Sequence, residues 1–140
     1  MGVLIDTCIW IDVEQGRLGP GDVATVTGEQ PVYVSPVTLA ELRLGAELAP
    51  DAGVRQRRLR TWRRMTRKPL IPIDAGTAEV FGDLAAHLAR QSGPRHRTRV
   101  QDLWLASQAI QHGLVFLTRN ERDFKDIPGL ELKGIGSAET

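Results

Sequence analysis

The chain begins Met1-Gly2-Val3-Leu4-Ile5-Asp6-Thr7-Cys8-Ile9-Trp10. Val3 to Ile5 is an unbroken apolar run with two β-branched residues, a pattern that predicts the central strand of a parallel sheet with helices on both faces. The run ends on a carboxylate, Asp6. Ligands of open α/β sheets bind beyond the carboxyl ends of the strands, so Asp6 is a candidate functional residue. The alternative is that Asp6 only caps the following helix, because Asp is a favoured N-cap residue.

The composition indicates a single globular domain over residues 1–140, since 140 residues suffice for one hydrophobic core. The hydrophobic content of 41% and the charged content of 25% are typical of soluble proteins. One cysteine, Cys8, excludes an internal disulfide, and we interpret it as a small buried filler. No apolar run approaches the length of a membrane span and no secretory leader is evident, so we expect a cytoplasmic protein without membrane contact.

Strand-like and helix-like segments alternate along the rest of the chain. Further strands are expected at 32–34, 70–73, 114–117 and 130–132, and Pro72 places the second of these at an edge. Helices are expected at 7–14, 22–27, from Pro36 onward, and at 52–68, 74–90 and 100–112. This alternation predicts an α/β fold, a three-layer α/β/α sandwich around a short, mostly parallel sheet.

Four carboxylates fall where this fold brings strand ends and helix starts together. Asp6 and Asp123 follow predicted strands, whereas Glu41 and Asp102 lie in the first turns of predicted helices. Each helical acid has a simpler interpretation, because Glu41 can point into solvent and the helix dipole alone favours Asp102. If all four converge, their mutual repulsion calls for a cation. Oxygen ligands suit Mg²⁺ or Mn²⁺, and such sites typically hydrolyse phosphodiesters.

At this point the chain resembles the PIN-domain ribonucleases, specifically the VapC-type toxins of toxin–antitoxin pairs. The resemblance covers nearly the whole chain and depends on four motifs in the right order. They are Val3-Leu4-Ile5-Asp6-Thr7, Ser35-Pro36-Val37-Thr38-Leu39-Ala40-Glu41-Leu42, Gln101-Asp102-Leu103-Trp104-Leu105-Ala106 and Leu117-Thr118-Arg119-Asn120-Glu121-Arg122-Asp123-Phe124.

The resemblance implies a PIN-like nuclease domain and a role for each matching residue. Asp6, Glu41 and Asp102 would be the core metal-binding acids, with Asp123 as a fourth and more variable one. Polar helpers near the metal would be Thr7, Thr118 and Asn120. The implied activity is that of an Mg²⁺- or Mn²⁺-dependent endoribonuclease acting as a toxin, with RNA as substrate, a cognate antitoxin as partner and a homodimer as the assembly. Cys8 stands where family members often have Asn or Ser.

The basic residues divide into two sets. Those flanking the predicted cleft, which we expect to contact RNA, are Arg95, Arg97, Arg99 and Arg119. The helix at 52–68 carries a narrow apolar stripe that includes Leu59 and Trp62, suited either to a partner or to the protein's own core. On this helix we expect Leu59, Trp62, Arg57, Arg60 and Arg64 to bind the antitoxin, which the family's toxins commonly seat near this region.

Two other functional classes remain open from the sequence. One is a catalytically silent PIN-fold module that binds RNA or protein, although the intact set of acids argues against it. The other is a receiver-like phosphoacceptor, which also gathers acids above a parallel sheet. A receiver needs paired acids near the start and a Lys after a late strand, whereas the predicted strand at 114–117 is followed by Thr118-Arg119.

Overall fold

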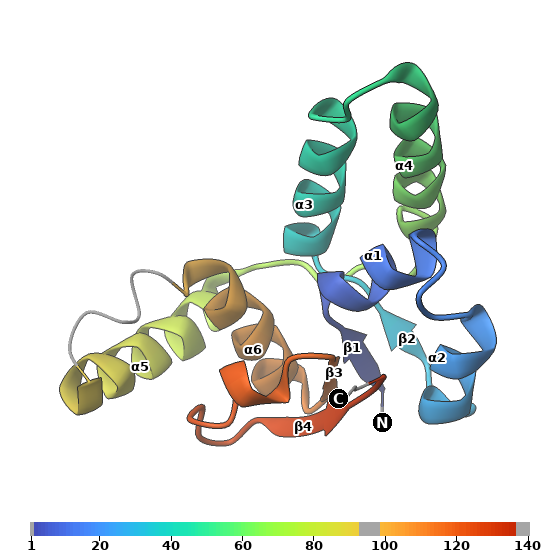
Figure 1. The fold of residues 1–140 in the computed structure, drawn as a ribbon. Coiled ribbons are helices and arrows are strands. Elements are labelled where there is room, and N and C mark those ends of the chain that lie inside the picture. Colours follow the sequence, from blue (N-terminus) through green and yellow to red (C-terminus); the bar gives the residue numbers. More distant parts are fainter. Residues whose placement is uncertain (1, 93–98, 137–140) are drawn as a thin grey trace.

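The computed structural model describes residues 2–92 and 99–136. Figure 1 shows the order of the elements along the chain. They are β1 (Val3–Ile5), α1 (Thr7–Glu14), α2 (Pro20–Thr27), β2 (Val32–Tyr33), α3 (Pro36–Glu47), α4 (Ala52–Met65), α5 (Ala75–Ser92), α6 (Val100–His112), β3 (Val115–Thr118), the short 3-10 helix η2 (Glu121–Asp123) and β4 (Glu131–Gly134).

The sheet has the order β2-β1-β3-β4, and every neighbouring pair is parallel. The prediction of a parallel sheet is therefore confirmed, and β1 lies inside it between β2 and β3. In the register of β1 with β3, Ile5 lies opposite Leu117. The residues that follow these two, Asp6 and Thr118, consequently come out side by side at the carboxyl edge of the sheet.

Helices cover both faces of the sheet, which confirms the three-layer α/β/α architecture. Side chains alternate along a strand between the two faces. Leu4 and Phe116 pack into a core formed with α5 and α6, whereas Val3 and Ile5 pack into a second core formed with α1 to α4. The unbroken apolar run at the start of the chain thus contributes to both cores, as expected for a strand buried on each side.

Helices α3 and α4 form an antiparallel pair that projects from the sheet like an arm (Figure 1). Ser35 caps α3 by accepting the amide hydrogen of Val37 at 3.0 Å, and Pro36 occupies the first helical turn, where its missing N–H costs nothing. In the same way Asp51 caps α4 by accepting from Val54 at 2.9 Å. These caps fix where each helix of the arm begins.

The predicted strand at 70–73 is wrong as a full strand. Only a single parallel bridge forms, between Leu70 and Val34. Beyond it, Pro72 has no N–H to donate, and the carbonyl of Ile71 accepts a 2.6 Å hydrogen bond from the side chain of Gln108 instead of from a strand. The last strand also lies one residue later than predicted at its start, because β4 begins at Glu131.

Candidate active site

Asp6 lies at the point where β1 turns into α1. It occupies the N-cap position with φ −64° and ψ 147°, yet its side chain makes no capping hydrogen bond. Its Oδ2 instead accepts hydrogen bonds from the hydroxyl of Thr118 at 2.8 Å and from the thiol of Cys8 at 3.4 Å. Asp6 is only 7% exposed. The capping interpretation therefore does not hold, and Asp6 is a buried carboxylate held from two sides.

The turn after β3 orients the donor that reaches Asp6. The Thr118 hydroxyl is fully buried, donates to Asp6, and accepts the amide hydrogen of Asn120 at 3.0 Å. The two polar helpers predicted in this segment, Thr118 and Asn120, thus both lie at the carboxyl edge. Asn120 contributes its backbone amide, not its side chain, to the hydrogen bond with Thr118. The interpretation of Cys8 as a buried filler is incomplete, because Cys8 is only partly buried and its thiol contacts Asp6. Its place where the family often has Asn or Ser is the one signal for such a contact in the sequence.

Glu41 is carried to the same edge by α3. The Thr7 hydroxyl, at the start of α1, donates a 2.6 Å hydrogen bond to Oε1 of Glu41 and lies 2.9 Å from Oγ1 of Thr38. Thr38 is one turn before Glu41 on α3 and is fully buried. The hydroxyl pair links the beginning of α1 to the first turns of α3, so Glu41 points inward and is half-buried, not directed into solvent.

Asp102 and Asp123 come from the other half of the chain. Asp102 lies half-buried in the first turn of α6, and Asp123 lies in η2. The two elements are joined by Arg99, which pairs with Asp126 at 2.8 Å and donates a hydrogen bond to the carbonyl oxygen of Asp123. Arg99 therefore fixes the start of α6 against η2.

The negative charges of the four acids affect one another's pKa values. Burial, and then the negative charges of Asp6, Asp123 and Glu41, raise the pKa of Asp102 to about 6, while Arg99 opposes this shift. Burial also raises the pKa of Asp6, with a smaller contribution from Asp123, and the pKa of Glu41, with a contribution from Asp6. The four predicted acids therefore lie close enough for their charges to affect one another, and like charges disfavour one another's ionisation.

This arrangement predicts a pH dependence of stability in metal-free protein. Because the pKa of Asp102 is about 6 in the folded state against an ordinary value of 3.8, the folded protein binds the proton more tightly. The stabilisation is complete below about pH 4 and is lost as the pH rises to about 6. We expect Asp102→Asn to gain about 1–2 kcal/mol over wild type between pH 4 and 7, after allowance for solvent screening of a half-buried group.

Urea unfolding of both proteins in EDTA, at a series of pH values, measures this difference. Asp74, whose pKa is lowered by its hydrogen bonds to Gln111 and Thr77, provides the matched control, because Asp74→Asn should lose stability relative to wild type as the pH rises through the range of carboxyl titration. Parallel curves for wild type and Asp102→Asn would contradict the raised pKa of Asp102.

The donor set suits a hard divalent cation. All four acids offer oxygen ligands, which Mg²⁺ and Mn²⁺ prefer. Within residues 2–92 and 99–136, no group of three or more Asp, Glu, His or Cys side chains is arranged so that it could hold a metal ion by itself. Mg²⁺ usually keeps several waters and takes only one or two carboxylates in proteins, with further ligands from the substrate's phosphates, so these acids would need to supply only part of its coordination shell.

The residues predicted to contact RNA are placed differently. Arg95 and Arg97 lie outside the described residues. Arg99 binds Asp126 and the Asp123 carbonyl, as described above. Arg119 follows Thr118, and its guanidinium contacts both carboxylate oxygens of Asp12, a buried residue of α1. Both described arginines therefore make intramolecular contacts beside the acids.

The residues predicted to bind a partner on α4 divide into a packed set and an open set. Leu59 is buried, and the indole nitrogen of Trp62 donates to the carbonyl of Leu39 at 3.1 Å, so both pack within the arm. Arg57 pairs with the largely buried Glu14 at 2.6 Å. Arg60 and Arg64 line a groove of about 530 Å³ that is rich in arginines; the others are Arg57, Arg63 and Arg67.

Comparison with known proteins decides the family. The family model of the PIN domain matches residues 3–130 of this chain. The chain belongs to the PIN-domain family. Among curated PIN relatives, it is 34% identical to "Ribonuclease VapC5" of Mycobacterium tuberculosis over 131 residues, covering 90% of this chain and 87% of that protein. It is 30% identical to "Ribonuclease VapC" of Rickettsia bellii, covering 94% and 95% respectively.

A solved structure agrees with this assignment. A chain in the crystal structure of DNA-bound VapBC from Salmonella typhimurium superposes with a TM-score of 0.81 at 26% identity, covering 96% of this chain and 98% of that one. The resemblance predicted from the four motifs is thereby confirmed. In the part of the chain that the structure describes, no helix is long and apolar enough to cross a membrane.

Proposed function

We propose that this chain, as one domain over residues 1–140, is a metal-dependent endoribonuclease that acts in the cytoplasm as the toxin of a toxin–antitoxin pair. The observation that carries the proposal is that Asp6, Asp123 and Glu41, from distant segments, lie near enough to Asp102 for their charges to add to the effect of burial in raising its pKa. The curated relatives named as VapC ribonucleases support the same activity.

The mechanism assigns the acids to an Mg²⁺ or Mn²⁺ ion, which activates water and neutralises phosphate charge when bound. Asp6, Glu41 and Asp102 would hold the ion, and Asp123 would be a fourth acid beside it. The chain's own hydrogen bonds prepare two of these ligands, because Thr118 fixes a carboxylate oxygen of Asp6 and Thr7 fixes one of Glu41. Glu41 also lines a pocket of about 210 Å³ between α1, α3 and α4, with Ile11 and Arg58 in its wall; Asp6, Asp102 and Asp123 do not line this pocket.

We expect the purified protein to cleave single-stranded RNA with Mg²⁺ or Mn²⁺ and to stop cleaving in excess EDTA, because unneutralised carboxylates would repel the phosphate. Cleavage is measured on a labelled RNA oligonucleotide, and re-addition of Mn²⁺ after EDTA is the control for irreversible damage. Undiminished cleavage in EDTA would rule out the metal mechanism. A folded, Mn²⁺-binding protein that cleaves no RNA would instead support the catalytically silent PIN-fold module.

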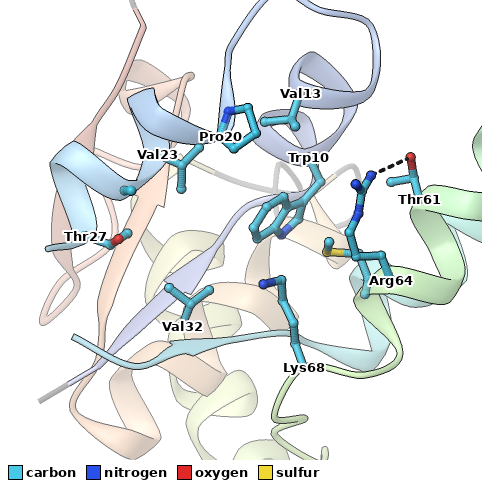
Figure 2. Close-up of a pocket in the computed structure, with 11 residues that line it drawn as sticks. Trp10, Val13, Pro20, Val23, Thr27, Val32, Thr61, Arg64 and Lys68 are labelled. Carbon is cyan, nitrogen blue, oxygen red and sulfur yellow. Dashed lines mark hydrogen bonds between the residues drawn. The ribbon is translucent and has the colours of Figure 1, made fainter. Parts of the chain in front are cut away.

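The antitoxin is proposed to occupy the arginine groove of α4 and an adjoining apolar pocket. That pocket has a volume of about 260 Å³ and shares Val13, Pro20, Thr61 and Arg64 with the groove. Figure 2 shows the Lys68 side chain extending toward the indole ring of Trp10 at this pocket. The Lys68 ammonium lies 5.3 Å from the centre of the indole ring. An apolar side chain next to acidic residues is the complementary partner segment.

Trp10 supplies a specific reason to expect a partner in this pocket. The residue is 8% exposed, and its indole nitrogen finds no hydrogen-bond acceptor among the described residues. A buried donor without an acceptor costs free energy, which a partner's carbonyl or carboxylate oxygen would recover if the Trp10 side chain turned its nitrogen toward the pocket on binding. Near the C-terminal end of α3, Leu44 and Leu48 are strongly exposed, which supports the proposal that the toxin forms a homodimer.

Trp10→Phe is expected to affect the free toxin and its complex differently. In the free protein the free energy of unfolding should change by less than about 1 kcal/mol, because the weaker packing of the smaller ring is offset by removal of an unpaired buried donor. Binding of the antitoxin should weaken about tenfold, or about 1.4 kcal/mol. Urea unfolding and titration calorimetry measure the two quantities. Trp104→Phe is the control, since Trp104 stacks on Phe81 in α5; equal affinities for wild type and Trp10→Phe would contradict the assignment.

A further inference from the structure

The turn after β3 is tied to α1 by a buried ion pair. Arg119 Nη1 lies 2.7 Å from Oδ1 and 2.6 Å from Oδ2 of Asp12. The Asp12 side chain is 3% exposed, whereas that of Arg119 is 37% exposed. A carboxylate buried to this extent needs a cation or several donors to remain charged. The contact therefore determines where Arg119 lies and is not an incidental surface pair.

Asp12 is itself held in place on α1. Its backbone carbonyl accepts the amide hydrogens of Arg17 at 2.8 Å and of Leu18 at 3.3 Å, at the end of the helix. A second guanidinium, that of Arg17, reaches Oδ1 at 3.2 Å, but its side chain is 63% exposed. Asp12 is thus fixed in position, with Arg119 of the turn after β3 as a close cation and Arg17 of the loop after α1 as a more exposed one.

What Asp12 anchors is the turn that presents a donor to Asp6. Thr118, the residue before Arg119, donates its hydroxyl to Asp6 at 2.8 Å. The residue after it, Asn120, donates its amide hydrogen to the same hydroxyl at 3.0 Å. Arg119 lies between these two contacts, so a shift of its backbone would move both. The thiol of Cys8, one turn before Asp12 on α1, donates to the same Asp6 oxygen as Thr118.

We propose that Asp12 is a positioning residue of the nuclease: through Arg119 it fixes the turn that aims Thr118 at Asp6. The inference builds on the proposed metal-dependent nuclease activity. It assigns Arg119 to the same positioning unit, in place of the RNA contact expected from the sequence. Partners of this kind around a metal ligand typically change metal affinity or activity by about 10–100-fold when they are mutated.

The test compares Asp12→Asn, Arg119→Gln and the double variant. Each single change should lower kcat on an RNA oligonucleotide about tenfold, change KM less than about twofold, and weaken Mn²⁺ binding by calorimetry about tenfold. The double variant should be no worse than the poorer single variant, because both changes break one unit. Arg17→Gln is the matched control. It removes the other cation from the same carboxylate without touching the β3 turn, and it should retain wild-type kcat and Mn²⁺ affinity.

Two results would overturn the proposal. If Arg119 contacts RNA, Arg119→Gln raises KM and reduces the log–log salt slope by about 0.7, while Asp12→Asn leaves kcat unchanged. If the pair only stabilises the fold, the melting temperature falls while kcat and Mn²⁺ affinity, measured well below it, stay at wild-type values.

The Asp12→Asn variant keeps the proposal testable if Arg119→Gln fails to fold. Arg119→Gln leaves the buried Asp12 with Arg17 alone and can unfold the protein. Asp12→Asn leaves a partly exposed guanidinium that water can solvate, so this variant should stay folded. The Mn²⁺ affinity of Asp12→Asn therefore decides whether the pair has a positioning role. A wild type that binds Mn²⁺ but cleaves no RNA would refute the proposed function, while the Mn²⁺ affinities would still test the positioning role.

Discussion

Asp6→Asn is expected to lower the rate of RNA cleavage by at least about 10³-fold, which corresponds to about 4 kcal/mol of transition-state stabilisation. The amide keeps the shape of the side chain but removes the negative charge that a divalent cation needs at the centre of the cleft. Thr118 can still donate to the amide oxygen, so the edge of the sheet should keep its structure. The measurement is single-turnover cleavage of an RNA oligonucleotide with saturating Mn²⁺.

The control for this variant is Glu29→Gln, which removes one negative charge from the exposed turn between α2 and β2. It should cleave at the wild-type rate. Growth gives a second readout, because wild-type toxin expressed without antitoxin should arrest the cells and Asp6→Asn should not. A folded Asp6→Asn protein that keeps a tenth or more of wild-type activity would remove Asp6 from the proposed metal site.

The position of the acids can be predicted from sequence because one rule of parallel sheets sets it. Strands that run in the same direction end at the same edge, so acids that follow strands or begin the next helices must gather there. This rule places both Asp6 and Asp102. In the structure the charge of Asp6 raises the pKa of Asp102, an interaction that the rule alone does not quantify.

What could not be predicted are contacts between side chains that neither periodicity nor strand order relates. Asp12 and Arg119 are 107 residues apart, and nothing in the pattern of α1 distinguishes Asp12 from an ordinary solvent-facing acid. The burial of Asp12 appears only when the β3 turn packs onto α1. Likewise, residues 70–73 have the composition of a strand, but the carbonyls of Ile71 and Pro72 accept hydrogen bonds from the side chain of Gln108 in α6. The local sequence does not encode this tertiary contact.

The stripe on α4 illustrates the same limit in a different way. Apolar residues at helical spacing form a face that must pack against something, but the spacing does not show whether that is the protein's own core or a partner. In the structure α3 covers Leu59 and Trp62. The surface left for a partner is the other side of the helix, where Arg60 and Arg64 line the groove beside the Trp10 pocket.

Replacing Arg60 and Arg64 together by Gln is therefore expected to weaken the antitoxin complex about 100-fold and to leave RNA cleavage nearly unchanged. Removing each positive charge from a partly desolvated groove should cost about 1.4 kcal/mol, or a factor of ten in affinity. Arg57 is left intact because it neutralises the largely buried Glu14, and its replacement would disturb the fold as well as the interface. Calorimetric titration with the antitoxin, and cleavage of an RNA oligonucleotide, measure the two effects.

The matched comparison neutralises Arg95 and Arg97, which we expect from their place just before Asp102 to contact the RNA backbone. That double variant should cleave RNA less well and should bind the antitoxin with normal affinity. Its log–log salt slope should fall by about 0.7 for each phosphate that is no longer neutralised. The opposite pair of results, in which Arg60→Gln/Arg64→Gln abolishes cleavage and the Arg95 and Arg97 variant fails to bind the antitoxin, would make the α4 groove the RNA-binding surface. The Trp10 pocket, which shares Arg64 with that groove, would then have to accommodate a nucleobase in place of an apolar side chain of the antitoxin.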